Sequence, residues 1–372
     1  MMRVLLLHFN FSLLLVISAL AQNELRVTVE VEGIQDRTVY LKQDHAELGR
    51  IVVDSVLVKS NRVEFTAEIA EPNLYVLEVD SVPGFLTFIW DNDIQIVGHT
   101  DSLWRSIISG SDETKLWQDY QRKYADPARY KLIDLTPVMH KAIADKDLVL
   151  LEKITEDQHE ILKEVQKNSF AFIEGHPDSF VSLSLLRHHA DNVALDTTKS
   201  ALRLLAPHWQ GHSVYQYLSE WAAHKTSVLP GEPAPAFSAA TFEGEPISLD
   251  NFRGNYVILD FWGTWCEPCV KKMPQMNQLR QSYPKDQLEM LFFNRDRDVD
   301  AFSKALKKYD IGWGHHFFTN KDLIRRYGAG AIPKLYLISP EGKILYNDDD
   351  QEAGNAELKI LSELLASRLN SK

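Results

Sequence analysis

Apolar and polar residues alternate with a period of two in the first part of the chain. Between Leu25 and Val31 every second side chain is apolar, which is typical of a strand with one buried face. Turn residues separate this run from further short runs of strand character at 38–41, 51–53, 62–65 and 75–79. Several short strands at this spacing predict a small antiparallel sandwich or barrel over residues 22–110. Because no cluster of titratable residues there looks catalytic, we expect a structural or docking module.

The period changes to that of a helix further along the chain. Apolar residues recur three and four positions apart among Lys and Glu between Leu135 and Val165, and a second such stretch runs from Thr198 to His224. The pattern predicts a helical connector over residues 111–226, with its charged residues on solvated faces. A Pro-rich segment at 226–235 then predicts a stiff linker and a domain boundary.

Beyond the linker, strand and helix patterns alternate. The apolar run at 256–262 has the length of a strand buried on both faces, and Gly263 ends it. We expect strands at 256–262, 288–293, 334–339 and 343–347, and helices at 266–283, 299–309, 322–327 and 355–369. This alternation predicts an α/β sheet with helices on both faces over residues 227–372. The fold class is therefore multidomain: a β-rich sandwich-like domain, a helical connector and an α/β domain.

The N-terminus has the layout of a signal peptide. Arg3 precedes a mostly apolar segment at 4–18, and residues 19–21 match a small-x-small cleavage site. We therefore expect residues 1–21 to be removed and the protein to be exported to the periplasm or cell envelope. The alternative is an uncleaved membrane anchor. Gln22, where a lipid anchor would need a cysteine, argues against lipidation, and no later run reaches the ~20 apolar residues of a membrane span.

Composition and charge narrow the class of protein. The chain has 372 residues, of which 45% are hydrophobic, and this composition fits two or three globular domains and excludes a disordered chain. The net charge of −12 argues against nucleic acid and anionic lipid surfaces as partners.

Two cysteines hold the candidate chemistry. Cys266 and Cys269 are the only cysteines of the sequence, and they lie where the strand at 256–262 meets a helix. A pair with this spacing can close and reopen a disulfide, and a helix N-terminus favours a thiolate over a thiol. Trp265 can shield one side of the sulfur. The alternatives are an inert buried pair and a metal site, but zinc would need a second CxxC or a His-x3-His motif, which the sequence lacks.

The segment around the cysteines resembles the thioredoxin superfamily. The shared features are Asp260-Phe261-Trp262, Trp265-Cys266-Glu267-Pro268-Cys269, Pro274, Ile332-Pro333 and the segment 246–254. Residues 227–372 are most similar to the exported TlpA/ResA-like branch of that superfamily. The N-terminal β region resembles the DUF4369-like domain of Bacteroidetes-type envelope proteins.

The resemblance implies a role for each matching residue. Cys266 would be the nucleophile at the exposed start of the helix, and Cys269 would be the resolving cysteine. Asp260 would be a buried carboxylate with a raised pKa that accepts a proton, unless neighbouring groups simply satisfy it. Pro333 would form a cis peptide bond facing the disulfide and leave the Ile332 backbone free to pair with an extended substrate. The active-site environment would further include Trp265, Glu267, Pro268 and Lys272.

Lys272 departs from the resemblance. ResA-like proteins carry a glutamate three residues after the second cysteine, whereas this chain carries a lysine. Because Lys272 lies one turn past Cys269, we expect its ammonium to favour a nearby thiolate. The alternative is a side chain that extends into solvent, where its charge is screened.

Three other polar clusters give weaker signals. His315 and His316 are adjacent, so on a strand they face opposite sides and cannot bind one metal ion. Asp348-Asp349-Asp350 has the composition of a solvated turn. Asp296-Arg297-Asp298 follows a predicted strand, where it either borders the substrate groove or begins a helix.

Together these features predict a thiol–disulfide oxidoreductase that reduces protein disulfides. Cys266 would form a mixed disulfide with the substrate, and Cys269 would resolve it, with no cofactor and no metal. The resemblance also implies a membrane electron donor of the CcdA/DsbD type and a place in cytochrome c maturation. One alternative is a peroxiredoxin-like (AhpC/TSA-related) peroxidase, which would need Pro-x-x-x-Thr-x-x-Cys, although Gly263 stands three residues before Cys266. The other is a redox-silent partner-binding protein.

Overall fold

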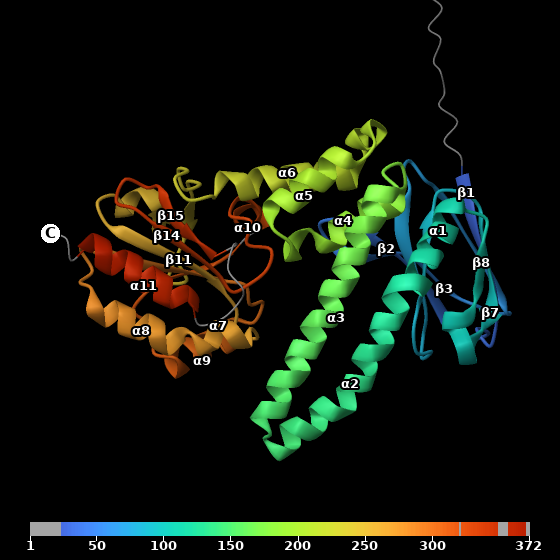
Figure 1. Ribbon diagram of the computed structural model, residues 1–372, viewed down its shortest axis with the longest axis horizontal. Helices are drawn as coiled ribbons and strands as arrows, with labels where there is room; N and C mark the ends of the chain where they lie inside the picture. Colours follow the sequence, from blue (N-terminus) through green and yellow to red (C-terminus); the bar gives the residue numbers. More distant parts are fainter. Residues whose placement is uncertain (1–23, 320, 349–355, 370–372) are drawn as a thin grey trace, which may run out of the picture. The chain divides into compact units, whose positions relative to one another are not determined.

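Figure 1 shows the computed structural model, which describes residues 24–319, 321–348 and 356–369. The predicted signal peptide at 1–21 lies outside the described residues. The described chain forms two compact units, one up to residue 45 together with 49–119, the other made of 46–48 and 120 onward. Among the described residues, no helix is long and apolar enough to cross a membrane.

The first unit consists of two β-sheets that share one core. One sheet has the strand order β4 (Arg62–Glu68), β1 (Glu24–Glu32), β7 (Ile94–His99), β8 (Ile107–Ser109). The other has the order β3 (Gly49–Leu57), β2 (Thr38–His45), β5 (Asn73–Val79), β6 (Leu86–Trp90). Val27, Val29 and Val31 of β1 point into the same core as Phe88 and Trp90 of β6. The β-rich fold expected from the period-two pattern is therefore confirmed.

The expectation of a purely antiparallel arrangement is wrong in one place. Strands β1 and β7 pair in parallel, whereas β1 and β4 are antiparallel. A parallel pair needs a long connection between its strands, and here the whole second sheet lies between β1 and β7 in the sequence. The 3-10 helix η1 (Thr100–Arg105) follows β7, and α1 (Asp112–Tyr120) follows β8. Thr114 of α1 accepts from the Ile89 N–H at 2.9 Å and donates to its carbonyl at 2.8 Å, which ties α1 to β6.

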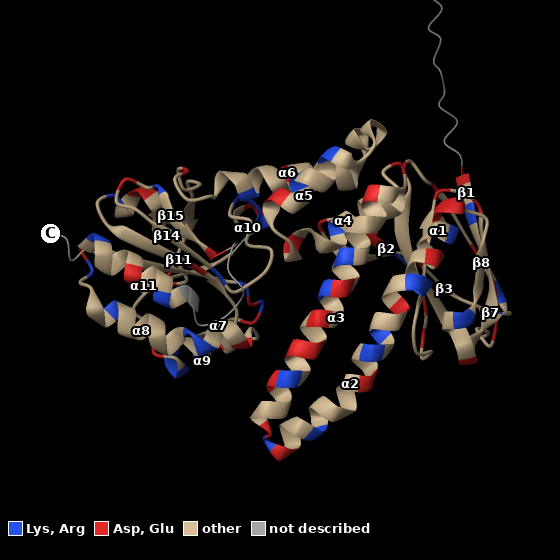
Figure 2. Cartoon of the chain, in the orientation of Figure 1, with Lys and Arg blue, Asp and Glu red and all other residues tan. Residues whose placement is uncertain are grey.

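The middle of the chain is helical, as expected. Its elements are η2 (Gln121–Ala125), α2 (Asp126–Asp145), α3 (Leu148–Gly175), α4 (Phe180–His189), η3 (Ala190–Asn192), α5 (Leu195–Leu204), η4 (Pro207–Gly211) and α6 (Ser213–Ser227). Helices α2 and α3 form a hairpin, and Lys146 adopts a left-handed conformation (φ 55°) at its turn. The Asp147 side chain caps α3 by accepting from the Leu150 N–H at 3.0 Å. Acidic and basic residues lie along both helices (Figure 2), and the Lys131 ammonium of α2 is 3.5 Å from the Glu164 carboxylate of α3.

The C-terminal part is an α/β sheet covered on both faces. The strand order is β13 (His315–Phe318), β12 (Leu288–Asn294), β11 (Tyr256–Trp262), β14 (Lys334–Ile338), β15 (Ile344–Asn347). β11, β12 and β13 are parallel, and β14 and β15 are antiparallel to their neighbours. The remaining elements are β9 (Ser238–Ala240), β10 (Pro246–Ser248), η5 (Leu249–Phe252), α7 (Glu267–Lys271), α8 (Met273–Ser282), α9 (Val299–Lys308), α10 (Lys321–Arg326) and α11 (Ala356–Leu369). This is the thioredoxin-like fold that the resemblance implied.

Alternate residues of β11 supply the two cores of this sheet. Ile258 and Trp262 face a cluster that includes residues of α8, α9 and α11. Val257, Leu259 and Phe261 face the opposite cluster, which includes Leu323 of α10. Asp260 has the same parity as Ile258 and Trp262, so its carboxylate lies on the face that also contains the cysteines.

The helix expected at 266–283 is interrupted. α7 ends at Lys271 and α8 begins at Met273, and Lys272 has a ψ of −14° between them. Pro274 explains the interruption, because proline has no N–H to donate to the carbonyl four residues earlier and its ring crowds that carbonyl.

Candidate active site at the Cys266–Cys269 disulfide

Cys266 and Cys269 form a disulfide with an S–S distance of 2.02 Å. Cys266 is the N-cap residue of α7, and its sulfur lies 3.3 Å from the Cys269 N–H. Cys266 is 6% exposed and Cys269 is 0% exposed. An incoming thiol or disulfide therefore meets Cys266 first, although less of this residue is open than the expectation of an exposed nucleophile suggested.

The residues next to the disulfide leave one side accessible. Trp265 is 64% exposed, and its indole lies over Gly263, where an added Cβ would come within 3.0 Å of the ring. Glu267 forms an ion pair with Lys271 at 2.8 Å on the solvent side of α7. The hydrogen bond from Lys271 lowers the pKa of Glu267. Pro268 lies in the first turn of α7, where its missing N–H costs no hydrogen bond.

Asp260 is fully buried on the face of the sheet that also contains the cysteines, and it is paired with Lys272. The Lys272 ammonium donates to Asp260 Oδ1 at 2.6 Å, while Oδ2 is buried without a hydrogen-bond partner in the described structure. Burial raises the pKa of Asp260, the largest effect, and the charge and hydrogen bond of Lys272 offset this increase in part. The raised pKa agrees with the direction expected from the sequence.

Lys272 lies in the interior, and its effect on a cysteine thiolate stays a prediction because the cysteines form a disulfide here. Its side chain is 8% exposed, so the alternative that it extends into solvent is wrong. Its ammonium donates a hydrogen bond to Asp260 Oδ1 at 2.6 Å. The break between α7 and α8 places the Lys272 side chain next to Asp260. The electrostatic effect of Lys272 on the cysteines is therefore combined with that of the opposite charge of Asp260.

A second buried ion pair lies at the start of β14. The Lys334 ammonium is 2.8 Å from Asp348 Oδ1, and the Leu335 N–H donates to Asp348 Oδ2 at 2.8 Å. Asp348 is buried, so the expectation of a solvated turn is wrong for this residue, because its carboxylate is held by a strand N–H and an ammonium. Asp349 and Asp350 lie outside the described residues. The negative charge of Asp348 also contributes to the raised pKa of Asp260.

Strand pairing brings the cysteines and Pro333 to one edge of the sheet. Phe261 of β11 pairs with Lys334 of β14 in antiparallel register. The chain leaving β11 toward Cys266 and the chain entering β14 from Pro333 therefore meet at the same edge. The Ile332–Pro333 peptide bond is cis, as the resemblance implied.

Two polar residues that directly follow the neighbouring strand β12 also reach this edge. Asp296 accepts from the Thr264 N–H at 3.1 Å and from its hydroxyl at 2.9 Å. Arg295 donates to the Gly330 carbonyl at 2.7 Å. Sequence reasoning noted Asp296 without deciding its role and missed Arg295. The available signal was the position of both residues directly after a buried parallel strand, where functional side chains commonly lie.

The remaining polar clusters lie away from this edge or are structural. Asp298 caps α9 by accepting from the N–H groups of Asp300 and Ala301 at 2.9 and 3.1 Å. His316 is buried and bonded to the Ile311 carbonyl at 2.7 Å, and burial lowers its pKa. His315 is only partly buried, so the two rings face opposite sides as expected. Within the described residues, no group of three His, Cys, Asp or Glu is placed to hold a metal ion.

Comparison with known proteins identifies two matching domain families. The AhpC/TSA family matches residues 230–347, and the domain of unknown function DUF4369 matches residues 25–117. The thiol-disulfide oxidoreductase ResA of Bacillus thuringiensis subsp. konkukian (strain 97-27) is 36% identical over 115 residues, 31% of this chain and 66% of that protein. ResA of Bacillus anthracis is 33% identical over 135 residues, 36% of this chain and 76% of that protein.

Solved structures with the same kind of domain are also similar. A putative thiol:disulfide interchange protein DsbE from Chlorobium tepidum is 27% identical, with a TM-score of 0.35, and the match covers 38% of this chain and 99% of that one. A thiol-disulfide oxidoreductase from Bacteroides fragilis NCTC 9343 is 32% identical, with a TM-score of 0.30, over 35% of this chain and 99% of that one.

Fold and site define a thioredoxin-like domain with a cysteine pair at the junction of strand and helix, preceded by a DUF4369 domain. The chain belongs to the family of ResA-like thiol-disulfide oxidoreductases. The matches to these two relatives cover about a third of this chain.

Proposed function

We propose that this protein is a cell-envelope oxidoreductase that reduces disulfides in protein substrates. The observation that carries the proposal is the Cys266–Cys269 disulfide, which has one more accessible and one buried sulfur and lies on the same face of the sheet as the buried carboxylate of Asp260. An accessible sulfur suits attack on a substrate, a buried one suits resolution, and a carboxylate with a raised pKa suits proton transfer near neutral pH.

In the proposed reaction the dithiol form begins the cycle. The Cys266 thiolate attacks one sulfur of the substrate disulfide, the substrate S–S bond breaks, and the departing substrate thiolate takes up a proton. The Cys269 thiol then loses its proton and attacks the Cys266 sulfur of the mixed disulfide, which releases the second substrate thiolate. The substrate gains two electrons and two protons, and the protein returns to the disulfide form of this structure.

Asp260 is proposed to accept the proton of Cys269. Its unpaired Oδ2 lies on the cysteine-bearing face of the sheet, and burial keeps its proton affinity high. Lys272 stabilises the carboxylate form, so that the proton can be given up again. The backbone of Ile332, next to the cis bond, is proposed to pair with an extended stretch of the substrate.

Each turnover consumes two electrons, so a reductant must restore the dithiol. We propose a membrane donor of the CcdA/DsbD type and a place in cytochrome c maturation, as the family resemblance implies. Export rests on the signal-like pattern of residues 1–21.

The experiment is a pair of assays on the purified protein, one of insulin reduction with a chemical reductant and one of peroxide consumption. We expect insulin reduction and a reduction potential nearer ~−270 mV than ~−120 mV. The AhpC/TSA match makes the peroxidase a specific rival. A threonine at position 263, which that chemistry would need, would displace the Trp265 ring. Peroxide consumption without insulin reduction would refute the proposed function, and activity in neither assay would favour a redox-silent binding protein.

A further inference from the structure

Two consecutive residues at the end of β12 hold the two chain segments that flank the active-site edge. Arg295 and Asp296 directly follow Asn294, the last residue of β12. The Arg295 N–H donates to the Trp262 carbonyl at 2.9 Å, so the backbone of β12 continues its pairing with the end of β11. In extended chain, neighbouring side chains point to opposite sides, and these two side chains reach different segments.

Asp296 holds the segment that leads into the cysteines. Its carboxylate accepts from the Thr264 N–H at 3.1 Å and from the Thr264 hydroxyl at 2.9 Å. The Asn294 side chain sets the orientation of Asp296. Its Nδ2 donates to Asp296 Oδ2 at 2.8 Å, and its Oδ1 accepts from the Asp296 backbone N–H at 2.8 Å. Thr264 is two residues before Cys266, so this network fixes the approach of the chain to the nucleophile.

Arg295 holds the segment that leads into the cis bond. Its guanidinium donates to the Gly330 carbonyl at 2.7 Å and to the Ala329 carbonyl at 3.3 Å. These carbonyls lie two and three residues before Ile332, whose backbone is the proposed substrate-pairing strand. A planar guanidinium presents its donors in a fixed geometry, so one nitrogen that bridges two consecutive carbonyls restrains the segment more than a single contact would.

We propose that Arg295 and Asp296 are positioning residues that fix the separation between the Cys266 turn and the Ile332–Pro333 segment, and thereby the affinity for extended polypeptide substrates. The inference rests on the proposed function and adds a specificity determinant to it. An extended substrate must contact Ile332 and Cys266 at once, so its binding depends on that separation. A small disulfide contacts only the sulfur and depends on it much less.

The test compares R295A with R297A in the full-length protein. Arg297 is a matched control because it is exposed and has no hydrogen bond or ion pair to any described residue. We measure KM and kcat for a disulfide-bonded unfolded protein, and the second-order rate constant for a small aromatic disulfide. We expect R295A to raise KM for the protein substrate about tenfold, as loss of a charged hydrogen bond allows, with a much smaller effect on the small disulfide. R297A should match the wild type.

Two further variants keep the test independent of folding. R295K retains the positive charge but not the planar guanidinium, so its KM should lie between those of R295A and the wild type. T264V removes only the hydroxyl donor to Asp296 and should raise KM by a smaller factor than R295A. Equal KM values for R295A and the wild type would overturn the inference, as would equal losses for the protein substrate and the small disulfide. A wild type that does not reduce protein disulfides would instead overturn the proposed function.

Discussion

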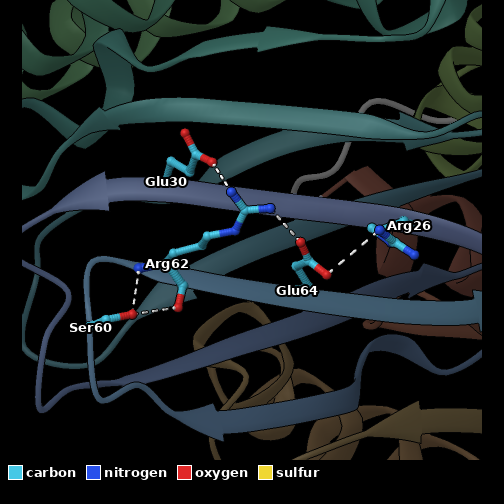
Figure 3. A network of polar contacts seen from close by, with 5 residues as sticks. All are labelled: Arg26, Glu30, Ser60, Arg62 and Glu64. Atoms are coloured by element: carbon cyan, nitrogen blue, oxygen red, sulfur yellow. Dashed lines mark hydrogen bonds and ion pairs between the residues drawn. The ribbon is translucent and has the colours of Figure 1, made fainter.

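The N-terminal β unit and the C-terminal α/β domain differ in where their ion pairs lie. In the β unit, ion pairs lie on the outer face of the sheet. Figure 3 shows Arg62 between Glu30 and Glu64. The Arg62 guanidinium lies 2.6 Å from a carboxylate oxygen of each, and the Glu64 carboxylate also lies 3.8 Å from the Arg26 guanidinium. In the α/β domain the pairs Lys272–Asp260 and Lys334–Asp348 are in the interior, where each side chain is at most 8% exposed.

The difference separates charges that water hydrates from charges that the protein interior must accommodate. Exposed pairs are hydrated and screened, so they contribute little to folding. A buried pair must overcome the desolvation of both ions, and an apolar pair of similar volume is often at least as stable. Buried titratable groups are therefore concentrated where a proton or a charge is used. Both buried pairs lie near the edge of the sheet that holds the disulfide, in agreement with this rule.

The largest effect is expected at the cysteines. C266S removes the attacking sulfur and should abolish insulin reduction, whereas C269S leaves the attack intact and should accumulate a mixed disulfide. Non-reducing gels of extracts incubated with each variant measure the captured species. If C266S captured substrate and C269S did not, the assignment of the two sulfurs would be reversed.

Some of this domain was predictable from local sequence, and some was not. The strand at 256–262 and the cysteine turn depend on contiguous residues, and the structure places the strand at the expected residues. The two buried ion pairs depend on pairings between separate elements: Lys272 meets Asp260 after a helix break, and Asp348 reaches Lys334 through the β14–β15 register. The local sequence pattern contains no information on such pairings. Neither the Lys272–Asp260 pair nor the Lys334–Asp348 pair was therefore predicted.

The strands of the β unit were also predictable only in part. The alternation in β1 was visible because one face is apolar and the other polar. Strands β6, β7 and β8 were not predicted, since β6 is buried along nearly its whole length and β8 has only three residues. The parallel pairing of β1 with β7 joins segments about 60 residues apart, which local periodicity cannot reveal.

The second largest effect is expected for K272M, which leaves Asp260 buried without its cation. Removing one partner of a buried pair costs about 3–5 kcal/mol, so the free energy of unfolding should fall by that order. K271M is the matched control, because Lys271 pairs with Glu267 on the exposed side of α7 and should be almost neutral. Chemical denaturation of the disulfide form measures both. A K272M protein as stable as K271M would show that the buried pair is not a structural requirement.

The stability loss expected for K272M should depend on pH through the pKa of Asp260. Burial raises its folded-state pKa above the unfolded value of ~3.9. Its protonated form therefore favours the folded state at low pH, and this contribution is lost as the pH rises through the folded-state pKa. Without Lys272 the folded-state pKa rises further. The stability difference between wild type and K272M should thus be smallest near pH 4 and widen toward neutral pH, and a constant difference would contradict this account.

A smaller effect is expected for D260N, whose amide oxygen can still accept from the Lys272 ammonium but no longer balances its charge, so that some stability is lost in addition to the kinetic effect. The amide keeps the volume but cannot accept the proton of Cys269, so release of the mixed disulfide should slow about 10²-fold. The attack by Cys266 should change little. Stopped-flow measurement of release between pH 5 and 9 tests this, because the wild-type rate should depend on the ionisation of Asp260 and the variant rate should not. Superimposable profiles would leave Asp260 with a structural role only.

The smallest effect is expected for R62A in the β unit, and it completes the contrast with K272M. Arg62 contacts two carboxylates, and its hydrogen bond lowers the pKa of Glu64, but all three side chains are open to water. Loss of the guanidinium leaves both carboxylates solvated rather than stranded in the interior, so no desolvation penalty remains. We expect calorimetric unfolding of R62A close to the wild type at low salt. At ~1 M salt, where the screening length is ~3 Å, the two should coincide. A salt-independent loss as large as that of K272M would show that the outer network is as essential to its unit as the buried pairs are to theirs.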